Sequence, residues 1–167
     1  MIPSSRALAL LGAAGLIVLS GLVVPSLSAV GLAMDALILS LILIDGRRAA
    51  QALLHVERAL PTTLHQDEDA EAQLTIDNPG ARVLDLHVRA VLPGALADAP
   101  VEERVLVPAE SRVSIPLPLT PRRRGEATIP PVAIRVRGPW GLGLAERSVL
   151  GTAPVRVLPT ARLDGEQ

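Results

Sequence analysis

The chain has 167 residues, a formal net charge of −1 and a hydrophobic fraction of 49%. Its 16 basic residues are all arginine and are balanced by 17 acidic ones, so the net basic character that a nucleic-acid footprint needs is missing. Trp140 is the single aromatic residue and cysteine is absent, which also excludes base stacking on several aromatics, disulfides and thiolate metal sites.

The hydrophobic residues are concentrated at the start of the chain. Ala7 to Val24 carries no charge and, at 1.5 Å per residue, reaches roughly 27 Å, close to the thickness of a bilayer core. Pro25, Ser26 and Ser28 interrupt the run, and a second apolar stretch follows from Ala29 to Ile44. This pattern predicts two transmembrane helices joined by a short turn.

Arginine placement predicts the orientation of this hairpin. Arg6 precedes the first span, Asp45 and Gly46 are expected to end the second, and Arg47 and Arg48 follow it. Because the turn between the spans has no Lys or Arg, both chain ends are expected on the cytoplasmic side of the plasma (inner) membrane, as a multi-pass protein.

A cleaved signal peptide, cut near Ser26-Leu27-Ser28, is the rival interpretation of the first span. A mature protein cut there would begin with another strongly apolar segment, which a secreted soluble domain does not need. Asp35 lies in that second segment. It is interpreted as lying near the outer membrane–water interface. A role as a proton relay is not favoured, because two transmembrane helices are too few to enclose a transport pathway.

From Ala70 onward, apolar and polar residues alternate with the period of two that is typical of strands. Ala70 to Asn78 and Leu84 to Leu92 are predicted to pair as a hairpin around Asn78-Pro79-Gly80. Further strands are predicted near residues 101–107, 113–119, 126–129, 132–136, 143–150 and 155–157. Pro116 and Pro118 place the strand at 113–119 on a sheet edge, because proline cannot donate to a ladder.

The expected fold is therefore a membrane α-hairpin plus an all-β domain: two transmembrane helices followed by an immunoglobulin-like antiparallel β-sandwich. The remaining roughly 110 residues are enough for a core of their own. The expected boundaries are residues 1–48 for the hairpin, 49–54 for a linker, 55–158 for the sandwich and 159–167 for a flexible tail.

Several distinctive segments follow one another in a fixed order: the two spans, Arg58 with Pro61 and Leu64, an acidic bend, LTIDNPG, Leu92-Pro93-Gly94, Arg122-Arg123-Arg124-Gly125 and Pro139-Trp140-Gly141-Leu142. Together they resemble the membrane-anchored front half of the bacterial proteins called domain of unknown function 58. Gly138 stands where that family usually has aspartate. The resemblance covers most of residues 1 to 158.

Members of that family normally continue into a larger domain that resembles a von Willebrand factor A fold and is often encoded beside a MoxR-type AAA+ ATPase. This sequence stops at Gln167 without such a domain. The resemblance implies a protein partner, such as a MoxR-type AAA+ ATPase system. It also leaves open that the chain is a shortened relative, or a fragment whose missing domain carries the function.

No catalytic, cofactor-binding or metal site is predicted. His55, His65 and His87 have no zinc-site spacing, and the acidic bend around Asp67-Glu68-Asp69 lacks the glycine and ligand spacing of a calcium loop. No serine lies in a nucleophile elbow. The strand face of Asp85, His87 and Arg89 is the one alternative site for catalysis or ligand binding.

Two motifs are candidates for contacts outside the domain. Arg122, Arg123 and Arg124 are either a charged turn that resists edge aggregation or a contact for lipid headgroups or a partner. Trp140, in the motif Pro139-Trp140-Gly141-Leu142, is predicted to be buried at one end of the sandwich, with an exposed anchor as the alternative.

The sequence thus favours a protein that is not an enzyme. We expect a membrane-anchored, cytoplasmic-side β-sandwich that acts as an interaction or scaffolding module, with the lipid bilayer and an unknown protein as partners and no cofactor. Its biological process and oligomeric state are not predicted.

Overall fold

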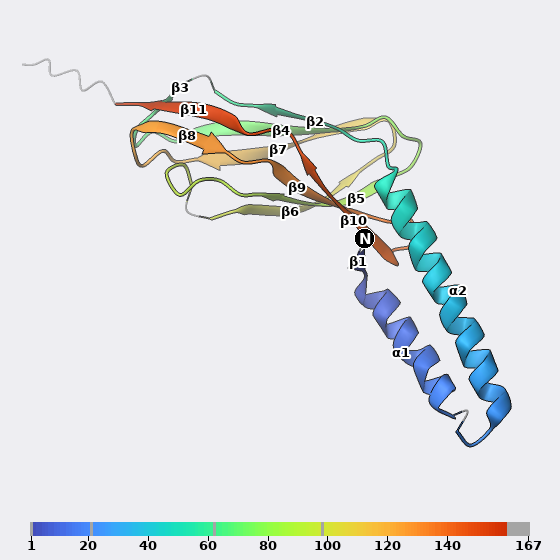
Figure 1. Cartoon of the computed structure of the whole chain (residues 1–167). Coiled ribbons are helices and arrows are strands. Elements are labelled where there is room, and N and C mark those ends of the chain that lie inside the picture. Colours follow the sequence, from blue (N-terminus) through green and yellow to red (C-terminus); the bar gives the residue numbers. More distant parts are fainter. Residues whose placement is uncertain (1, 21, 62, 98, 160–167) are drawn as a thin grey trace, which may run out of the picture. The chain divides into compact units, whose positions relative to one another are not determined.

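The computed structural model describes residues 2–20, 22–61, 63–97 and 99–159. Of the tail expected at 159–167, residues 160–167 lie outside this description. The described elements are β1 (Ile2–Pro3), α1 (Ser5–Ser20), α2 (Pro25–Ala50), β2 (His55–Ala59), β3 (Thr63–His65), β4 (Ala70–Asn78), β5 (Leu84–Ala90), β6 (Val101–Val107), β7 (Ser111–Leu119), β8 (Gly125–Ile129), β9 (Val132–Arg137), β10 (Gly143–Val149) and β11 (Ala153–Leu158) (Figure 1).

The chain divides into two compact units. Unit 1 holds the chain up to Ala52 together with Leu84–Leu86 and Arg135–Arg147, and unit 2 holds Leu53–Val83, His87–Ile134 and the chain from Ser148 onward. Strand pairing gives a five-stranded sheet of order β1-β10-β9-β5-β6 and two three-stranded sheets of order β3-β11-β8 and β2-β4-β7.

Unit 1 contains the two helices, which run side by side in opposite directions (Figure 1). They approach closely where Gly31 meets Val18, since a Cβ built on Gly31 would lie 2.6 Å from Val18 Cγ2. Among the described residues, one helix, Ser26–Ala50, is long and apolar enough to cross a membrane, and α1 is shorter with 16 residues.

The bounds of α2 differ from the prediction at both ends. Pro25 was expected to break the apolar run, but it occupies the first turn of the helix, where its missing N–H has no partner to lose. Asp45 and Gly46 were expected to end the helix, and this is wrong, because α2 continues through them to Ala50 and closes at Gln51. Asp35 therefore lies ten residues, or about 15 Å, beyond Pro25.

Unit 2 is a sandwich-like all-β fold whose core follows the predicted alternation. Along β4, Ala72, Leu74 and Ile76 are buried, and across the pair Leu74 lies opposite Ile115 of β7 while Ala72 lies opposite Leu117. Strands are confirmed at all the predicted positions, and β1, β2 and β3 are additional ones. One pair, β3 with β11, is parallel, which differs from the wholly antiparallel sandwich expected.

Strand β7 forms the edge of its sheet, as Pro116 and Pro118 predicted. The hairpin prediction for β4 and β5 is wrong, because β4 pairs with β2 and β7 while β5 lies between β9 and β6. Asn78 lies at the end of β4. Its buried amide nitrogen donates to the carbonyls of Val107 and Pro108 at 3.2 and 2.8 Å, so the end of β4 is held by the β6–β7 connection.

Arg58 of β2 is a second long-range contact within unit 2. Its guanidinium donates to the carbonyl oxygens of Pro130 and Gly151, each at 3.0 Å. Desolvation by burial lowers the pKa of Arg58 below its ordinary value. Since arginine loses its proton only at very high pH, it stays charged and the contact does not depend on pH in the physiological range.

Candidate functional site

The motif Pro139-Trp140-Gly141-Leu142 forms the tight connection between β9 and β10 in unit 1. The N–H of Gly138 donates to the carbonyl of Gly143, and the N–H of Gly141 donates to the carbonyl of Gly138, both at 2.9 Å. Gly141 has a φ of 69°, a left-handed conformation that glycine adopts without the steric penalty of a side chain. The loop therefore presents several of its amides in one direction.

Those amides bind the carboxylate of Asp45 in α2. Oδ1 accepts from the N–H of Trp140 at 2.9 Å, and Oδ2 accepts from the N–H groups of Leu142 and Gly143, both at 2.8 Å. The Asp45 side chain is 0% exposed. A buried carboxylate must find hydrogen-bond donors, and three backbone amides supply them, so Asp45 attaches the helix to the loop.

Glycine allows the helix and loop to approach this closely. A Cβ on Gly143 would lie 2.5 Å from the backbone nitrogen of Gly46 and 3.0 Å from the carbonyl oxygen of Ile42. A Cβ on Gly138 would collide with the Asp45 carboxylate. Because Gly138 has no side chain, it leaves room for the Asp45 carboxylate.

The last turn of α2 is closed by an arginine of β10. Arg147 donates to the carbonyls of Ala52 at 2.9 Å and Ala49 at 3.4 Å. Helix ends leave carbonyl groups without partners inside the helix, and a cation there satisfies them and complements the helix dipole.

The start of α1 also contacts this loop. The N–H of Ser4 donates to the carbonyl of Leu142 at 2.9 Å, while Ser4 Oγ accepts from the N–H of Ala7 at 3.2 Å and so caps the helix. The loop is therefore joined to the beginning of one helix and the end of the other. We call this arrangement of Ser4, Asp45, Arg147 and the loop 138–143 the helix–loop junction.

Trp140 is not buried in a core, so the prediction of burial is wrong. Its side chain is 44% exposed, and the guanidinium of Arg48 lies 4.7 Å from the centre of its ring. The main chain of Trp140 is fixed by Asp45, which leaves the indole on the outside of the loop. Sequence reasoning interpreted Asp45 as the end of the apolar run and therefore missed its role.

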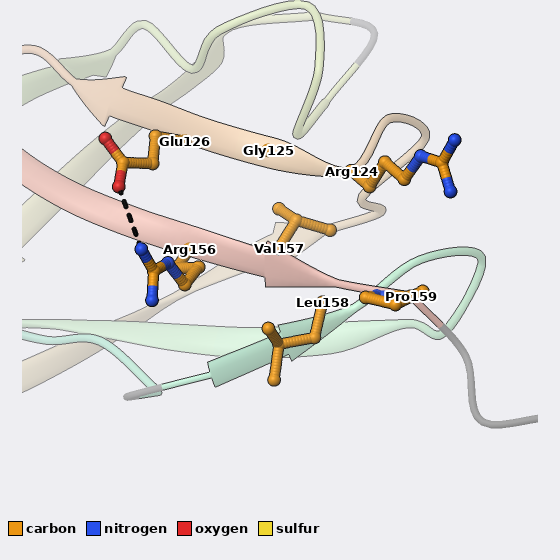
Figure 2. Close-up of a pocket in the computed structure, with 7 residues that line it drawn as sticks. All are labelled: Arg124, Gly125, Glu126, Arg156, Val157, Leu158 and Pro159. Atoms are coloured by element: carbon orange, nitrogen blue, oxygen red, sulfur yellow. Dashed lines mark hydrogen bonds and ion pairs between the residues drawn. The ribbon is translucent and has the colours of Figure 1, made fainter.

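Arg122, Arg123 and Arg124 are all exposed and precede β8 in unit 2. A shallow hollow of about 380 Å³ lies beside them, lined by Arg124, Gly125, Glu126, Arg156, Val157, Leu158 and Pro159. Figure 2 shows Arg124 pointing away from the Glu126–Arg156 ion pair, whose atoms are 3.3 Å apart. The two arginines therefore do not converge on one anion.

The alternative site at Asp85, His87 and Arg89 has its charged residues engaged elsewhere. Asp85 pairs with Arg137 at 3.7 Å in unit 1. Arg89 pairs with Glu102 at 2.9 Å in unit 2.

The acidic bend forms local contacts. Asp69 accepts a hydrogen bond from the hydroxyl of Thr120 at 3.0 Å, and the N–H of Asp67 donates to the carbonyl of Pro121 at 2.8 Å. Within the part of the chain that the structure describes, no group of three or more histidine or acidic side chains is placed to hold a metal ion.

No protein-family model and no curated protein matches the chain. Among solved structures, a fragment of alpha-2-macroglobulin from Escherichia coli, spanning domain MG7 to the C-terminus, aligns with 65% of this chain at 18% identity and a TM-score of 0.55. The chain spans 17% of the length of that fragment. This likeness supports the β-sandwich fold.

Two structures of the CARDB domain of PF1109 from Pyrococcus furiosus are also similar, both with a TM-score of 0.46. The crystal structure, in complex with di-metal ions, is 18% identical and aligns over 64% of this chain and 89% of the domain. The solution structure is 20% identical and aligns over 63% of this chain and 94% of the domain.

Proposed function

We propose that this protein is a membrane-anchored, non-catalytic interaction module, in which the helices fix the chain to a bilayer and the β-sandwich presents loops or strand edges to another protein. The observation that carries the proposal is the apolar surface of α2. The most apolar 18-residue window within Ser26–Ala50 has a mean hydropathy of 2.3, yet only 11% of that window is buried within the protein. A soluble protein rarely leaves so much apolar surface exposed to water.

The anchor that we propose is a two-span hairpin. Leu8, Leu16 and Leu19 of α1 are 58%, 68% and 60% exposed, so α1 also presents apolar side chains outward. Its 16 residues extend about 24 Å, somewhat less than a bilayer core, and a short helix is accommodated by local thinning of the bilayer. The packing of Gly31 against Val18 supports insertion of the two helices as one pair.

The positive-inside rule supports a cytoplasmic location for the sandwich. Arg6 begins α1 and Arg47 and Arg48 lie in the last turn of α2, whereas the turn between the helices contains no Lys or Arg. Both chain ends then lie in the cytoplasm of a cell whose plasma membrane holds the hairpin.

We further propose that the chain belongs with the front half of the domain of unknown function 58 proteins, and that its protein partner is a MoxR-type AAA+ ATPase system. This part of the proposal rests on the motif resemblance. The residues Pro139 to Leu142, which contribute to that resemblance, are those whose loop the Asp45 carboxylate binds.

Single-cysteine labelling tests the anchor and its orientation, because the native chain has no cysteine. Ser26→Cys lies in the first turn of α2, directly after the connection between the helices, and Thr152→Cys lies in the exposed β10–β11 connection. A membrane-impermeant thiol reagent added to intact cells is expected to label position 26 and to label position 152 only after permeabilisation. Labelling at position 152 but not at position 26 would show that the orientation is the reverse of the one proposed. Release of the protein from membranes by alkaline carbonate would refute the anchor.

A further inference from the structure

Three arginines lie at the same end of the helix pair. Arg6 is in the first turn of α1, and Arg47 and Arg48 are in the last turn of α2. Because the helices run in opposite directions, the start of one lies beside the end of the other (Figure 1). All three side chains are exposed.

These arginines have no acidic partner among the residues that the structure describes. Of the four acidic residues in unit 1, Asp35 lies twelve residues before Arg47 in α2, about 18 Å along the helix. The other three are engaged: the Asp45 carboxylate binds three backbone amides, Asp85 pairs with Arg137, and Glu146 pairs with Arg135 at 2.8 Å. The positive charge at this end of the helices is therefore uncompensated within its own unit.

Trp140 belongs to the same surface. Arg48 lies over its ring at 4.7 Å, and Arg6 Nη1 is 3.7 Å from the position that a Cβ on Gly141 would occupy. An exposed tryptophan beside arginines at the end of an apolar helix is the combination found at the boundary between hydrocarbon and headgroups, where the indole and the guanidinium each meet a suitable environment.

We propose that Arg6, Arg47, Arg48 and Trp140 form a binding surface for anionic phospholipid headgroups, of the phosphatidylglycerol type. The inference rests on the proposed membrane anchor and adds the class of lipid that the anchor prefers. Guanidinium groups bind phosphate oxygens with two parallel hydrogen bonds, and a lipid with net negative charge gains more from uncompensated arginines than a zwitterionic one. Each basic residue near an anionic surface is expected to contribute about fivefold.

Trp140 is a natural probe for this surface, since it is the chain's one tryptophan and the chain has no tyrosine. The full chain is reconstituted in phosphatidylcholine bilayers in two series. One series contains increasing fractions of brominated phosphatidylglycerol and the other increasing fractions of brominated phosphatidylcholine, with the bromine on the acyl chains near the headgroup in both. Bromine quenches the indole on contact. We expect half-maximal quenching at a several-fold lower fraction of the brominated phosphatidylglycerol, and we expect this preference to weaken as the salt concentration rises.

The charge-removing variant is Arg6→Gln with Arg47→Gln, which leaves Arg48 on the indole, and the matched variant is Arg6→Lys with Arg47→Lys. The glutamine pair is expected to remove most of the several-fold lipid preference, and the lysine pair to retain most of it. Arg89→Gln with Arg112→Gln removes the same charge from unit 2 and is expected to change nothing. Circular dichroism checks that every variant is folded.

Equal quenching by the two lipids in the native protein, an unquenched Trp140, or a preference that survives the glutamine pair would each overturn the inference. Carbonate extraction of the same chain separates this result from failure of the anchor. A protein that resists extraction but shows no lipid preference keeps the proposed anchor and loses the headgroup site, whereas an extractable protein loses both.

Discussion

The backbone N–H of Gly143 donates a 2.8 Å hydrogen bond to the carboxylate of Asp45, which lies 98 residues earlier in the chain. The same carboxylate also binds the amides of Trp140 and Leu142. A single side chain near the end of the apolar segment therefore fixes a loop of the β-strand region.

Replacement of Asp45 should release that loop. Asp45→Ala leaves three amide donors without their acceptor, and we expect the free energy of unfolding to fall by about 2–5 kcal/mol. Asp45→Asn offers one carbonyl oxygen in place of two carboxylate oxygens, so its effect should be smaller. Thermal unfolding in bilayer discs measures the stability, and hydrogen exchange should quicken at the three amides.

The control for Asp45 is Asp77→Ala, which removes an exposed carboxylate that pairs with Arg112 at 3.5 Å. Surface ion pairs of this kind contribute at most about 1 kcal/mol. Equal losses in the two variants would mean that the junction has no special role in stability.

Gly143→Ala tests the close approach of helix and loop. The new Cβ would meet backbone atoms of Gly46, which cannot rotate away as a flexible side chain does, and we expect a loss of about 1–3 kcal/mol. Gly151→Ala is the matched substitution, because a Cβ there has no neighbour within 4 Å. Thermal unfolding of both variants should show a lowered Tm for the first alone.

Trp140→Ala should have little effect on folding, because its side chain is 44% exposed and its contact with Arg48 is a surface cation–π interaction of about 0.5–1 kcal/mol. Leu74→Ala, at a position that is 0% exposed, should cost about 2–5 kcal/mol. Thermal unfolding followed by far-ultraviolet circular dichroism compares the two. If Trp140→Ala lowered the free energy of unfolding as much as Leu74→Ala does, Trp140 would have to be regarded as a core residue.

Asn78→Ala should destabilise unit 2. The amide nitrogen of Asn78, with two hydrogens to donate, lies within hydrogen-bond distance of three carbonyl oxygens, those of Arg82, Val107 and Pro108. Its side-chain oxygen accepts from the N–H of Gly80 at 3.1 Å. Removal of this buried group should cost about 2–4 kcal/mol.

Asn78→Asp should also fail to restore the wild-type stability, because a carboxylate cannot donate to the carbonyls. Ser111→Ala removes one exposed hydrogen bond to Pro108 and is the control, with an expected loss below about 1 kcal/mol. Chemical denaturation measures all three variants, and a neutral Asn78→Ala would show that the loop holds without the amide.

Local patterns predicted the strands well because alternation is a property of each segment alone. The alternation of Ala72, Leu74 and Ile76 with polar neighbours indicates β4 without any knowledge of its partners. Which strands pair depends on contacts between residues far apart in the chain. The contacts of Asn78 with the β6–β7 connection are of this kind, and the alternation within β4 or β5 does not reveal them. The hairpin prediction failed for this reason.

The junction was harder to predict. Asp45 lies just before two arginines at the end of an apolar run, and charged residues at such a position are typical of a membrane boundary. Its hydrogen-bond partners are backbone amides, so no oppositely charged residue in the sequence indicates them. The motif of Trp140 was recognised, but its burial was inferred from the absence of other aromatic residues. Exposure depends on which side of the loop the carboxylate binds, and only the structure gives that.

Pro116 and Pro118 interrupt the row of backbone donors on β7, the edge strand of its sheet, and both are exposed. The proposed membrane anchor would confine copies of the chain to one bilayer and raise the frequency of their collisions, and exposed strand edges are where such collisions produce aggregates. Each proline removes a donor that a neighbouring copy would need to extend the sheet. Crowded copies of this protein are therefore expected to remain separate along the β7 edge.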